Sequence, residues 1–280
     1  MGIRLASNSY GKVGNHLFKV VRTGDRHEVR DYRVDIELTG DYHAAHVEGD
    51  NTDVLATDTM RNTVYAVAAQ HEFDCPERLG GHLVDHLLTQ PRVAGATVRL
   101  VEQRWERIPA NGRPHDHAFT KASGGRHTAT VSGSGAQRSV TSGIEDLQVL
   151  KTTQSGWSGF AEGGYRTLRD TDDRILATSV TATWTATVST VDHAKLWDGV
   201  HAQIAETFTD HYSPSVQHTI YRMGQAVLQR FAEIDRISFE LPNRHHISYD
   251  LAPFGIPNDK EIFWVAVEPY GLITATVERD

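Results

Sequence analysis

The sequence predicts an α+β protein made of two similar halves, each with antiparallel strands and two helices. Two-residue hydrophobic alternation indicates the strands, and three- or four-residue spacing behind capping residues or proline indicates the helices. The elements occur as strand, strand, helix, helix, strand, strand, and this order is then repeated. We expect the first unit to span residues 1–140 and the second to span residues 141–280.

The first half opens with a predicted β-hairpin. Residues 12–22 have the character of a strand, and the sequence Thr-Gly-Asp-Arg at 23–26 is typical of a turn. In the strand that follows, charged residues alternate with Tyr32, Val34, Ile36 and Leu38. We therefore expect two antiparallel strands, followed by a loop at 40–51.

Two helices and two strands complete the first half. Thr57, Asp58 and Thr59 are capping residues before apolar residues at helical spacing, so Thr57 and Asp58 are expected at a helix N-terminus. A second helix is expected from Pro76, with Cys75 as a small buried residue at its start. The two strands are predicted at about 96–108 and 119–131.

The second half repeats this plan. Strands are expected at 146–153 and 175–188, and the longer one has an apolar face formed by Leu176, Val180, Ala182, Trp184, Ala186 and Val188. One helix is marked by Leu196, Val200, Ile204 and Phe208. Ser213-Pro214 is expected to cap the next helix, which carries Ile220, Met223, Val227 and Phe231. Strands at 237–251 and 261–277 close the set.

The predicted helices cover only one face of each sheet. Neither half supplies further helices for the other face. Because a sheet face needs cover, we expect a second copy of the chain to provide it, and therefore an oligomer.

Residues 237–251 form the predicted strand with the most unusual composition. Its apolar register is interrupted after Leu241 by Asn243 and His245, directly behind Pro242. An amide and an imidazole at positions that suit aliphatic side chains indicate a functional site. The alternative is a pair of hydrogen-bonded core polar groups near a strand bulge.

The composition narrows the classes of partner. The formal net charge is −8, from 36 acidic and 28 basic residues, which disfavours sequence-independent binding to nucleic acid and favours a small-molecule partner. Cys75 is the single cysteine, so there is no intrachain disulfide framework. The sequence has no apolar leader, no membrane-spanning stretch and no C-terminal peroxisomal tripeptide. We therefore expect a cytoplasmic, prokaryotic protein.

Two conspicuous motifs are interpreted as structural. The segment Gly133-Ser134-Gly135 lacks the third glycine of a dinucleotide-binding fingerprint and is expected to be a connecting loop. His115 and His117 are spaced like a ligand pair, but no HExxH helix or cysteine cluster accompanies them, so a structural turn is expected there. The sequence thus gives no positive sign of a metal or an organic cofactor.

Five short segments resemble the urate oxidase family, in the order that the family has them. They are Tyr10-Gly11-Lys12, Ala56-Thr57-Asp58-Thr59 with Asn62-Thr63-Val64-Tyr65, Leu150-Lys151-Thr152-Thr153, Asp173-Arg174-Ile175-Leu176-Ala177-Thr178, and Leu241-Pro242-Asn243-Arg244-His245. Together they span nearly the whole chain. The resemblance implies the tunnelling fold, in which two ββααββ units in tandem assemble into a barrel with the helices outside.

The resemblance also implies which residues handle protons and oxygen. Lys12 and Thr57 resemble the family's proton-handling pair, His245 resembles its third member, and Thr57 also contacts the substrate. Asn243 resembles the amide over the ring, where dioxygen or water binds. Because a lysine is protonated at neutral pH, a basic Lys12 requires either weaker proton affinity or a relay through Thr57 and water, which His245 could complete.

The remaining implied residues bind the purine. Phe160 resembles the aromatic on which the ring stacks, and Arg174 and Gln217 resemble the pair that binds its pyrimidine edge. An arginine offers a planar fork for two acceptors, and a glutamine offers one donor and one acceptor. Val216 and Asp58 resemble positions with backbone contacts. N–H groups at the Thr57 helix start would favour a urate anion.

The activity implied is oxidation of urate by O₂ and water to 5-hydroxyisourate and H₂O₂ in purine degradation, without a cofactor. Lys12 and Thr57 fall in the first unit, whereas Phe160, Arg174 and Gln217 fall in the second. Because neighbouring subunits of the tunnelling fold meet edge to edge, the resemblance implies a homotetramer with active sites at subunit interfaces. Two alternatives stay open: another purine- or pterin-binding enzyme of the same fold, or a non-catalytic purine-binding module.

Overall fold

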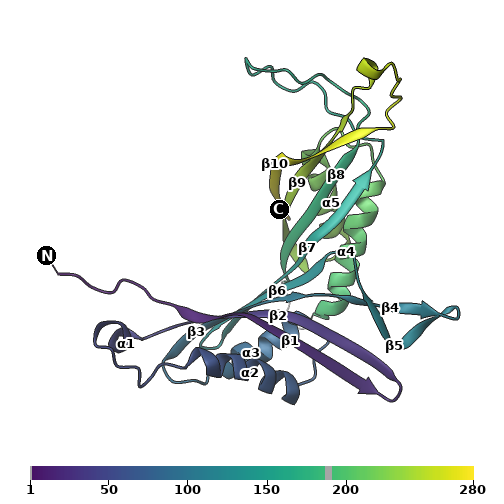
Figure 1. Ribbon diagram of the computed structural model, residues 1–280. Helices are drawn as coiled ribbons and strands as arrows, with labels where there is room; N and C mark the ends of the chain where they lie inside the picture. The colour runs from purple at the N-terminus through teal and green to yellow at the C-terminus, as the bar shows by residue number, and fades with distance from the viewer. Residues whose placement is uncertain (1, 187–190) are drawn as a thin grey trace. The chain divides into compact units, whose positions relative to one another are not determined.

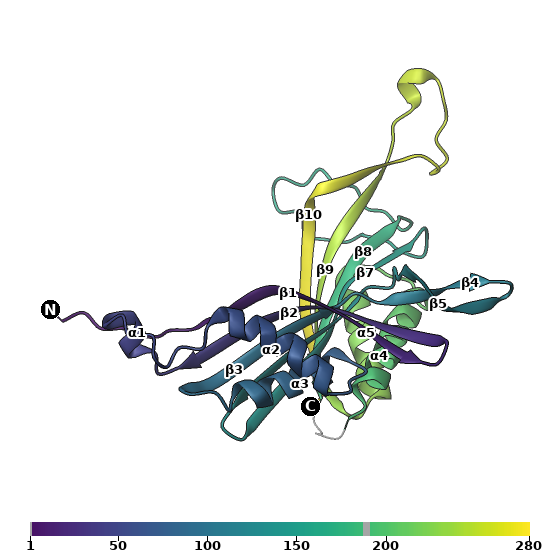
Figure 2. The same cartoon turned by 60° about the horizontal axis from the view of Figure 1, so that its bottom comes forward.

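The computed structural model describes residues 2–186 and 191–280, and the side chain of Val267 is not part of that description (Figures 1 and 2). The chain divides into two compact units. The first unit comprises residues 1–143 with 192–194, and the second comprises residues 144–191 with 195–280. Val188, expected on the apolar face of a strand, lies outside the described residues.

The first unit contains a sheet with strand order β1-β2-β3-β6 and helices on one face (Figure 2). Its elements are β1 (Tyr10–Thr23), β2 (Arg26–Gly40), α1 (His43–Val47), α2 (Thr57–Gln70), α3 (Pro76–Leu87), β3 (Val93–Glu102), β4 (Trp105–Ala110), β5 (Arg113–Lys121) and β6 (Arg126–Ser134). The strand β7 (Gln137–Lys151) begins in this unit and continues into the next.

The second unit contains a sheet with strand order β7-β8-β9-β10 and helices on one face (Figure 1). Its further elements are β8 (Leu176–Ala186), α4 (His193–Thr209), α5 (Val216–Arg230), β9 (Ile234–Ser248), the short 3₁₀ helix η1 (Ala252–Phe254) and β10 (Phe263–Glu278). The ββααββ order predicted for each half is present in the second unit, whereas the first unit adds the short helix α1 and the hairpin β4–β5 to it. The predicted α+β class is confirmed.

Three predictions about individual elements are wrong. The strands expected at 96–108 and 119–131 are each two strands, because the hairpin β4–β5 forms a separate two-stranded sheet. His115 and His117 accordingly lie on β5 and not in a turn. The loop expected at 40–51 contains the short helix α1.

The helix caps also differ from the predicted ones. Ser215, not Ser213, caps α5, and its Oγ accepts a hydrogen bond of 3.0 Å from the N–H of His218. The helix ends at Arg230, so Phe231 is its C-terminal cap. The α2 helix begins at Thr57 as expected, but its N-cap is Ala56 and no side chain makes a cap hydrogen bond. Cys75 is buried at the start of α3, as predicted.

Each unit has its own apolar core between its helices and the covered face of its sheet. The first core includes the alternating residues of β2, namely Tyr32, Val34, Ile36 and Leu38. The second includes Trp197 and Ile204 of α4 and Val180 and Trp184 of β8. Burial of this many aliphatic and aromatic side chains, at roughly 1.5–3 kcal/mol each, is the main stabilising contribution in both units.

A glycine lets the last α-helix of each unit lie close to its sheet. A Cβ atom added to Gly80 of α3 would lie 2.6 Å from Val131 Cγ2, and one added to Gly224 of α5 would lie 2.5 Å from Val277 Cγ2. A helical glycine costs about 1 kcal/mol relative to alanine. Close helix-to-sheet packing at equivalent places in both units explains why glycine is present despite that cost.

The opposite face of each sheet is polar. In the first unit Arg99 pairs with Glu37 at 3.2 Å, and Thr97 bonds to Ser132 at 3.0 Å. The equivalent face of the second unit carries Thr181, Thr183, Ser238, Glu240, Thr274 and Thr276. Water solvates such faces, so the absence of covering helices does not by itself require an oligomer.

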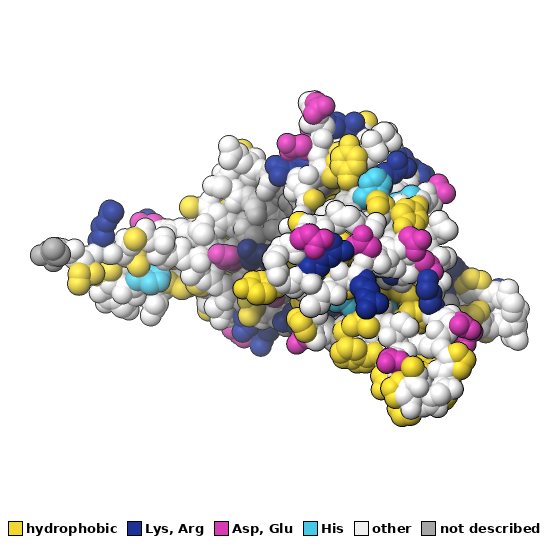
Figure 3. Space-filling view, turned by 90° about the horizontal axis from the view of Figure 1, so that it is seen from above, with side chains coloured by type: hydrophobic (Ala, Val, Ile, Leu, Met, Phe, Trp, Pro, Cys, Tyr) yellow, Lys and Arg dark blue, Asp and Glu magenta, His cyan; other side chains and the backbone are white. Residues whose placement is uncertain are grey.

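Exposed apolar side chains occur in both units, including Val13 and Phe18 of β1, and several of them lie on or next to β9 and β10. Ile247 and Tyr249, expected on a buried register, are 47% and 48% exposed, because the strand continues beyond its core, which ends at Leu241. Trp264 and Leu272 of β10 are similarly exposed. Figure 3 shows hydrophobic and basic side chains intermixed on the exposed surface.

A buried polar network stabilises the first unit. Glu77 of α3 accepts a 2.6 Å hydrogen bond from Ser142 and lies 2.8 Å from Nε2 of His127, whose Nδ1 is 3.6 Å from Glu102. Burial disfavours the charged forms, but hydrogen bonding outweighs it, so the pKa of Glu77 is lowered and that of His127 is raised. The pair is therefore a buried carboxylate and imidazolium.

Glu77→Gln is expected to destabilise the first unit by about 3–5 kcal/mol, because it leaves a buried cation without its nearest carboxylate. The thermal midpoint should fall by roughly 6–12 °C, measured by circular dichroism. Glu106→Gln, at an exposed position of β4, is the matched control and should change little. Equal midpoints for the two variants would contradict a charged pair.

The pH dependence of stability follows from the same pair. The contribution of His127, whose folded pKa is raised, is complete below its unfolded pKa of about 6.5 and is lost as pH rises through the folded pKa. The contribution of Glu77, whose folded pKa is lowered, is complete above about 4.3 and is lost as pH falls through the folded pKa. In Glu77→Gln, the free energy of unfolding should therefore change less with pH, both where His127 loses its proton and where Glu77 would gain one.

In the part of the chain that the structure describes, no helix combines the length and apolar composition that a membrane crossing needs.

Candidate active site

The outer half of β9 brings two predicted site residues to one place. Asn243 is paired with Thr178 of β8 and Gly271 of β10, and His245 is paired with Ala266. Pairing with β10 is irregular between Ala266 and Gly271, and the carbonyl of Pro242 accepts a 2.8 Å bond from Thr178 Oγ1. The bulge considered as an alternative is thus present, and it lies beside a cavity.

A cavity of about 570 Å³ in the second unit collects the predicted residues. Arg174, Val216, Gln217, Asn243 and His245 all line it. Its other lining residues are Trp157, Leu168, Arg169, Thr171, Ile175, His246, Ile247 and Ile273. Five candidates from three separate segments therefore line one cavity.

Arg174 presents an unpaired cation to this cavity. Its Nε is buried without a hydrogen-bond partner, and within the described residues no carboxylate lies at ion-pair distance from its guanidinium. Asp173 does not pair with it, since Asp173 bonds to Lys260 Nζ at 2.9 Å and to Thr153 Oγ1 at 2.8 Å. Burial lowers the pKa of Arg174. A buried guanidinium of this kind is suited to a planar anion.

The N-terminus of α5 borders the same cavity. Val216 and Gln217 are its first two residues, and the N–H groups of a first helical turn have no acceptor within the helix. Together with the positive end of the helix dipole, these groups favour an anion. The side chain of Gln217 adds one donor and one acceptor.

Phe160 does not line the cavity directly. It packs on Trp157, with ring centroids 5.2 Å apart and planes inclined by 12°. The guanidinium carbon of Arg166 lies 4.1 Å from the Phe160 centroid on this segment. The predicted stacking residue, Phe160, therefore lies behind Trp157. Trp157 is the aromatic residue that lines the cavity.

Lys12, Thr57 and Asp58 belong to the first unit. Lys12 is half-buried on β1, immediately before a register shift between Lys12 and Asn15. Thr57 and Asp58 are exposed at the start of α2. The carboxylate of Asp58 pairs with Arg61 at 2.7 Å, so its backbone rather than its side chain remains available to a ligand.

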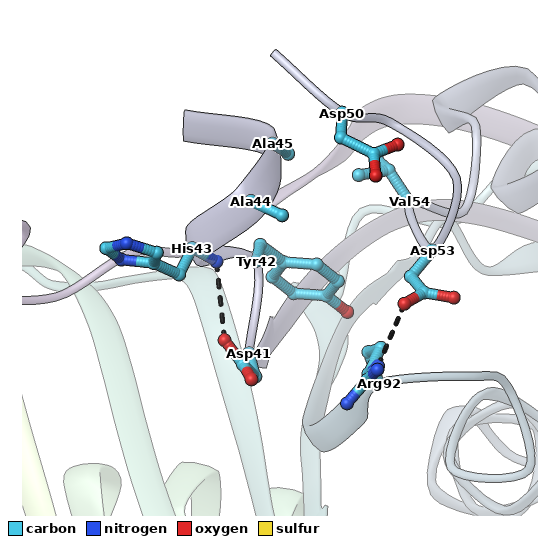
Figure 4. A pocket seen from close by; sticks show the side chains of 9 residues that line it. All are labelled: Asp41, Tyr42, His43, Ala44, Ala45, Asp50, Asp53, Val54 and Arg92. Atoms are coloured by element: carbon cyan, nitrogen blue, oxygen red, sulfur yellow. Dashed lines mark hydrogen bonds and ion pairs between the residues drawn. The ribbon is translucent and has the colours of Figure 1, made fainter. Parts of the chain in front are cut away.

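A smaller cavity of about 200 Å³ in the first unit contains none of the predicted residues. Figure 4 shows Asp53 bonded to Arg92, at 2.9 Å, and Asp41 bonded to the N–H of His43, at 3.4 Å. Asp50 accepts a 2.6 Å bond from Thr52. These carboxylates have local partners, which indicates a structural role.

Comparison with known proteins identifies the family. A model of the uricase family matches residues 8–132 and 140–274. The chain belongs to the uricase family. A uricase from Arthrobacter globiformis is 41% identical over 279 residues, which cover 99% of this chain and 90% of that protein. A crystal structure of uricase from Arthrobacter globiformis has a TM-score of 0.94 and covers 100% of this chain and 96% of that chain. The tunnelling fold expected from the resemblance is thereby confirmed.

The uricase relatives are not confined to bacteria. A uricase from Dictyostelium discoideum is 36% identical over 280 residues, covering 98% of this chain and 97% of that protein. The expectation of a prokaryotic source is therefore not supported. In residues 2–186 and 191–280 of this uricase family member, no three His, Cys, Asp or Glu side chains are grouped to hold a metal ion.

Trp157 is the most informative cavity residue that sequence reasoning missed. It lies between Gly156 and Ser158, in a segment without strand or helix periodicity. The available signal was a large aromatic residue in a glycine-rich segment, where the chain has little else to pack. Leu168, Arg169 and His246 gave no distinguishing signal.

Proposed function

We propose that this chain is a cofactor-independent urate oxidase, which converts urate, O₂ and water to 5-hydroxyisourate and H₂O₂. The observation that carries the proposal is the unpaired, partly buried Arg174 guanidinium beside Gln217 and the first turn of α5. Urate is a planar anion with acceptors and donors on adjacent edges. A cation, an amide and free N–H groups at one wall match those features.

Proton removal activates the substrate. Dioxygen is a triplet and does not add directly to a closed-shell molecule, so the protein must make urate a better one-electron reductant. In the proposal Lys12 and Thr57 accept a further proton from the urate anion, and His245 completes the relay. Electron transfer to O₂ then precedes formation of a hydroperoxide at the ring carbon that faces Asn243.

Loss of hydrogen peroxide from that carbon leaves an oxidised ring, and addition of water at the same carbon completes the reaction. Water supplies the hydroxyl group of 5-hydroxyisourate, and the two electrons removed from urate reduce O₂ to H₂O₂. Asn243 and His245 line one cavity with Arg174, which supports chemistry above a ring held by the arginine. Amide and imidazole groups can orient O₂ or water there without being consumed.

The proposal assigns each active site to two chains of a homotetramer. Lys12 and Thr57 lie in the first unit and Arg174 in the second. The outermost strand is β1 in the first unit and β10 in the second. In the proposal, the first unit of one chain meets the second unit of another at these edges. The exposed apolar residues of β9 and β10 support such a contact.

Oxidation of urate in air tests the function directly. Loss of urate absorbance and formation of H₂O₂ in equal amounts are expected from the purified chain. The same rates are expected after exhaustive dialysis against a metal chelator. Rates that vanish after chelation and return with one metal would contradict cofactor independence, and an absence of turnover in air would overturn the function itself.

Mixed oligomers test the shared site. Thr57→Ala and Arg174→Ala proteins should each be nearly inactive, but co-refolding should restore activity, because a mixed pair has one site with both intact halves. Random mixing into two-fold pairs predicts recovery of roughly a quarter of wild-type activity. No recovery, despite subunit exchange shown by mass spectrometry, would place the whole site in one chain.

A further inference from the structure

Trp157 is anchored more firmly than the residues that follow it. Its N–H donates to the carbonyl of Thr171 at 2.7 Å, and the N–H of Thr171 donates back at 2.9 Å. The neighbouring Gly156 bonds to the carbonyl of Ser213 at 2.9 Å. These bonds tie Trp157 to Thr171, which also lines the cavity, and close the base of the 158–170 segment.

The indole of Trp157 contacts two residues that are proposed to hold the purine. The Phe160 ring is stacked on it at 5.2 Å, within the range preferred by offset aromatic pairs. The guanidinium carbon of Arg174 is 5.9 Å from the indole centroid. Trp157 itself lines the cavity, so its position fixes the spacing between an aromatic plane and a cation.

Phe160, in contrast, has no comparable backbone anchor. It follows Gly159, whose φ is 68°, and its segment also has positive φ at Gly163 and Gly164. Its ring packs on the indole of Trp157 and under the guanidinium of Arg166, and its carbonyl accepts a 3.5 Å hydrogen bond from Arg166 Nη1. The orientation of the Phe160 ring therefore depends on these two side chains, of which only Trp157 also lines the cavity.

We infer that Trp157 is a positioning residue for the purine. It holds the plane of the Phe160 ring and its separation from Arg174, and so sets where the substrate ring lies in the cavity. The inference rests on the proposed function, since it takes a flat purine as the ligand. Its effect should appear in binding rather than in the chemical step, because the indole handles no proton.

Steady-state kinetics on two Trp157 variants, with anaerobic urate binding by equilibrium dialysis, test the inference. Trp157→Leu should raise both KM and the dissociation constant by roughly two- to tenfold, the range that one aromatic pair contributes, with kcat nearly unchanged. Trp157→Phe keeps a flat ring and should stay near wild type. Tyr165→Leu is the matched control, since Tyr165 is a 99% exposed aromatic of the same segment.

A double variant separates positioning from simple packing. If Trp157 acts through Phe160, Trp157→Leu with Phe160→Leu should bind urate no more weakly than Phe160→Leu alone. Three results would overturn the inference. The first is a double variant in which the effects of the two single substitutions on the dissociation constant multiply. The others are an unchanged KM in Trp157→Leu and a KM of Trp157→Phe as high as that of Trp157→Leu. If the leucine variant does not fold, Trp157→Met removes the flat ring with less loss of volume. If the wild-type protein turns over urate and the Trp157 variants have the same KM, only the role of Trp157 is refuted. If the wild-type protein does not bind urate, the proposed function is refuted as well.

Discussion

Lys12→Met is expected to lower kcat for urate oxidation by about 10²- to 10⁴-fold, the usual contribution of a positioned proton-transfer group. The backbone directly after Lys12 forms a bulge that hydrogen bonds hold in place. Gly14, with φ of 72°, donates to Asp35 at 2.6 Å, and Asn15 Nδ2 donates to the carbonyl of Val34 at 2.9 Å. A bulge held in this way directs the side chain beside it.

The measurement that checks this is kcat and KM from initial rates of urate loss. Lys121→Met, at an exposed lysine on β5, is the control for loss of a positive charge and should be unaffected. His245→Ala should change kcat in the same direction as Lys12→Met. A Lys12→Met protein with altered KM and normal kcat would show that Lys12 binds substrate instead of transferring protons.

Arg174→Ala is expected to raise KM by about 10²- to 10³-fold, because it removes two charge-assisted hydrogen bonds of roughly 1.5–3 kcal/mol each, part of which solvent replaces. Arg174→Lys should recover little of the loss, since an ammonium group cannot form the planar fork. The backbone supports that geometry, as the N–H of Arg174 donates to the carbonyl of Ser155 at 2.8 Å.

Arg236→Ala provides the control for Arg174, because Arg236 is an exposed arginine of β9 in the same unit. Anaerobic binding of urate should weaken in parallel with the rise in KM for Arg174→Ala. Near wild-type binding by Arg174→Lys would mean that a point charge suffices, and the two-contact role would have to be abandoned.

Periodicity predicted the elements that pack on a core. The alternation of Tyr32, Val34, Ile36 and Leu38 gave β2, and Pro76 with its apolar spacing gave α3. Periodicity gave wrong predictions for strands whose side chains are mostly exposed. The β4–β5 hairpin and the ends of β9 and β10 are largely exposed, so their residues carry no pattern that distinguishes one strand from two or a core register from a surface one.

The site could be predicted only in part, for a related reason. Arg174, Asn243 and His245 stand out by residue type in segments that resemble the uricase family. Gln217 lies outside those segments and was implied by the resemblance alone, and all four residues line one cavity. Trp157 lies in a segment of irregular backbone, and its position depends on bonds to Thr171, which is distant in sequence. Tertiary hydrogen bonds of this kind leave no local trace in a sequence.

The polar outer faces of the two sheets affect how the chain behaves during its synthesis. Domains generally fold as units from the N-terminus while the ribosome is still translating. The face of the first sheet that its helices leave uncovered carries Thr97, Arg99 and Ser132. This face is therefore polar and offers little apolar surface to other chains that are still being synthesised. The exposed apolar residues from Ile247 to Leu272 belong to the part made later. The exposed apolar residues of β9 and β10 thus leave the ribosome after the strands and helices of the first unit have been made.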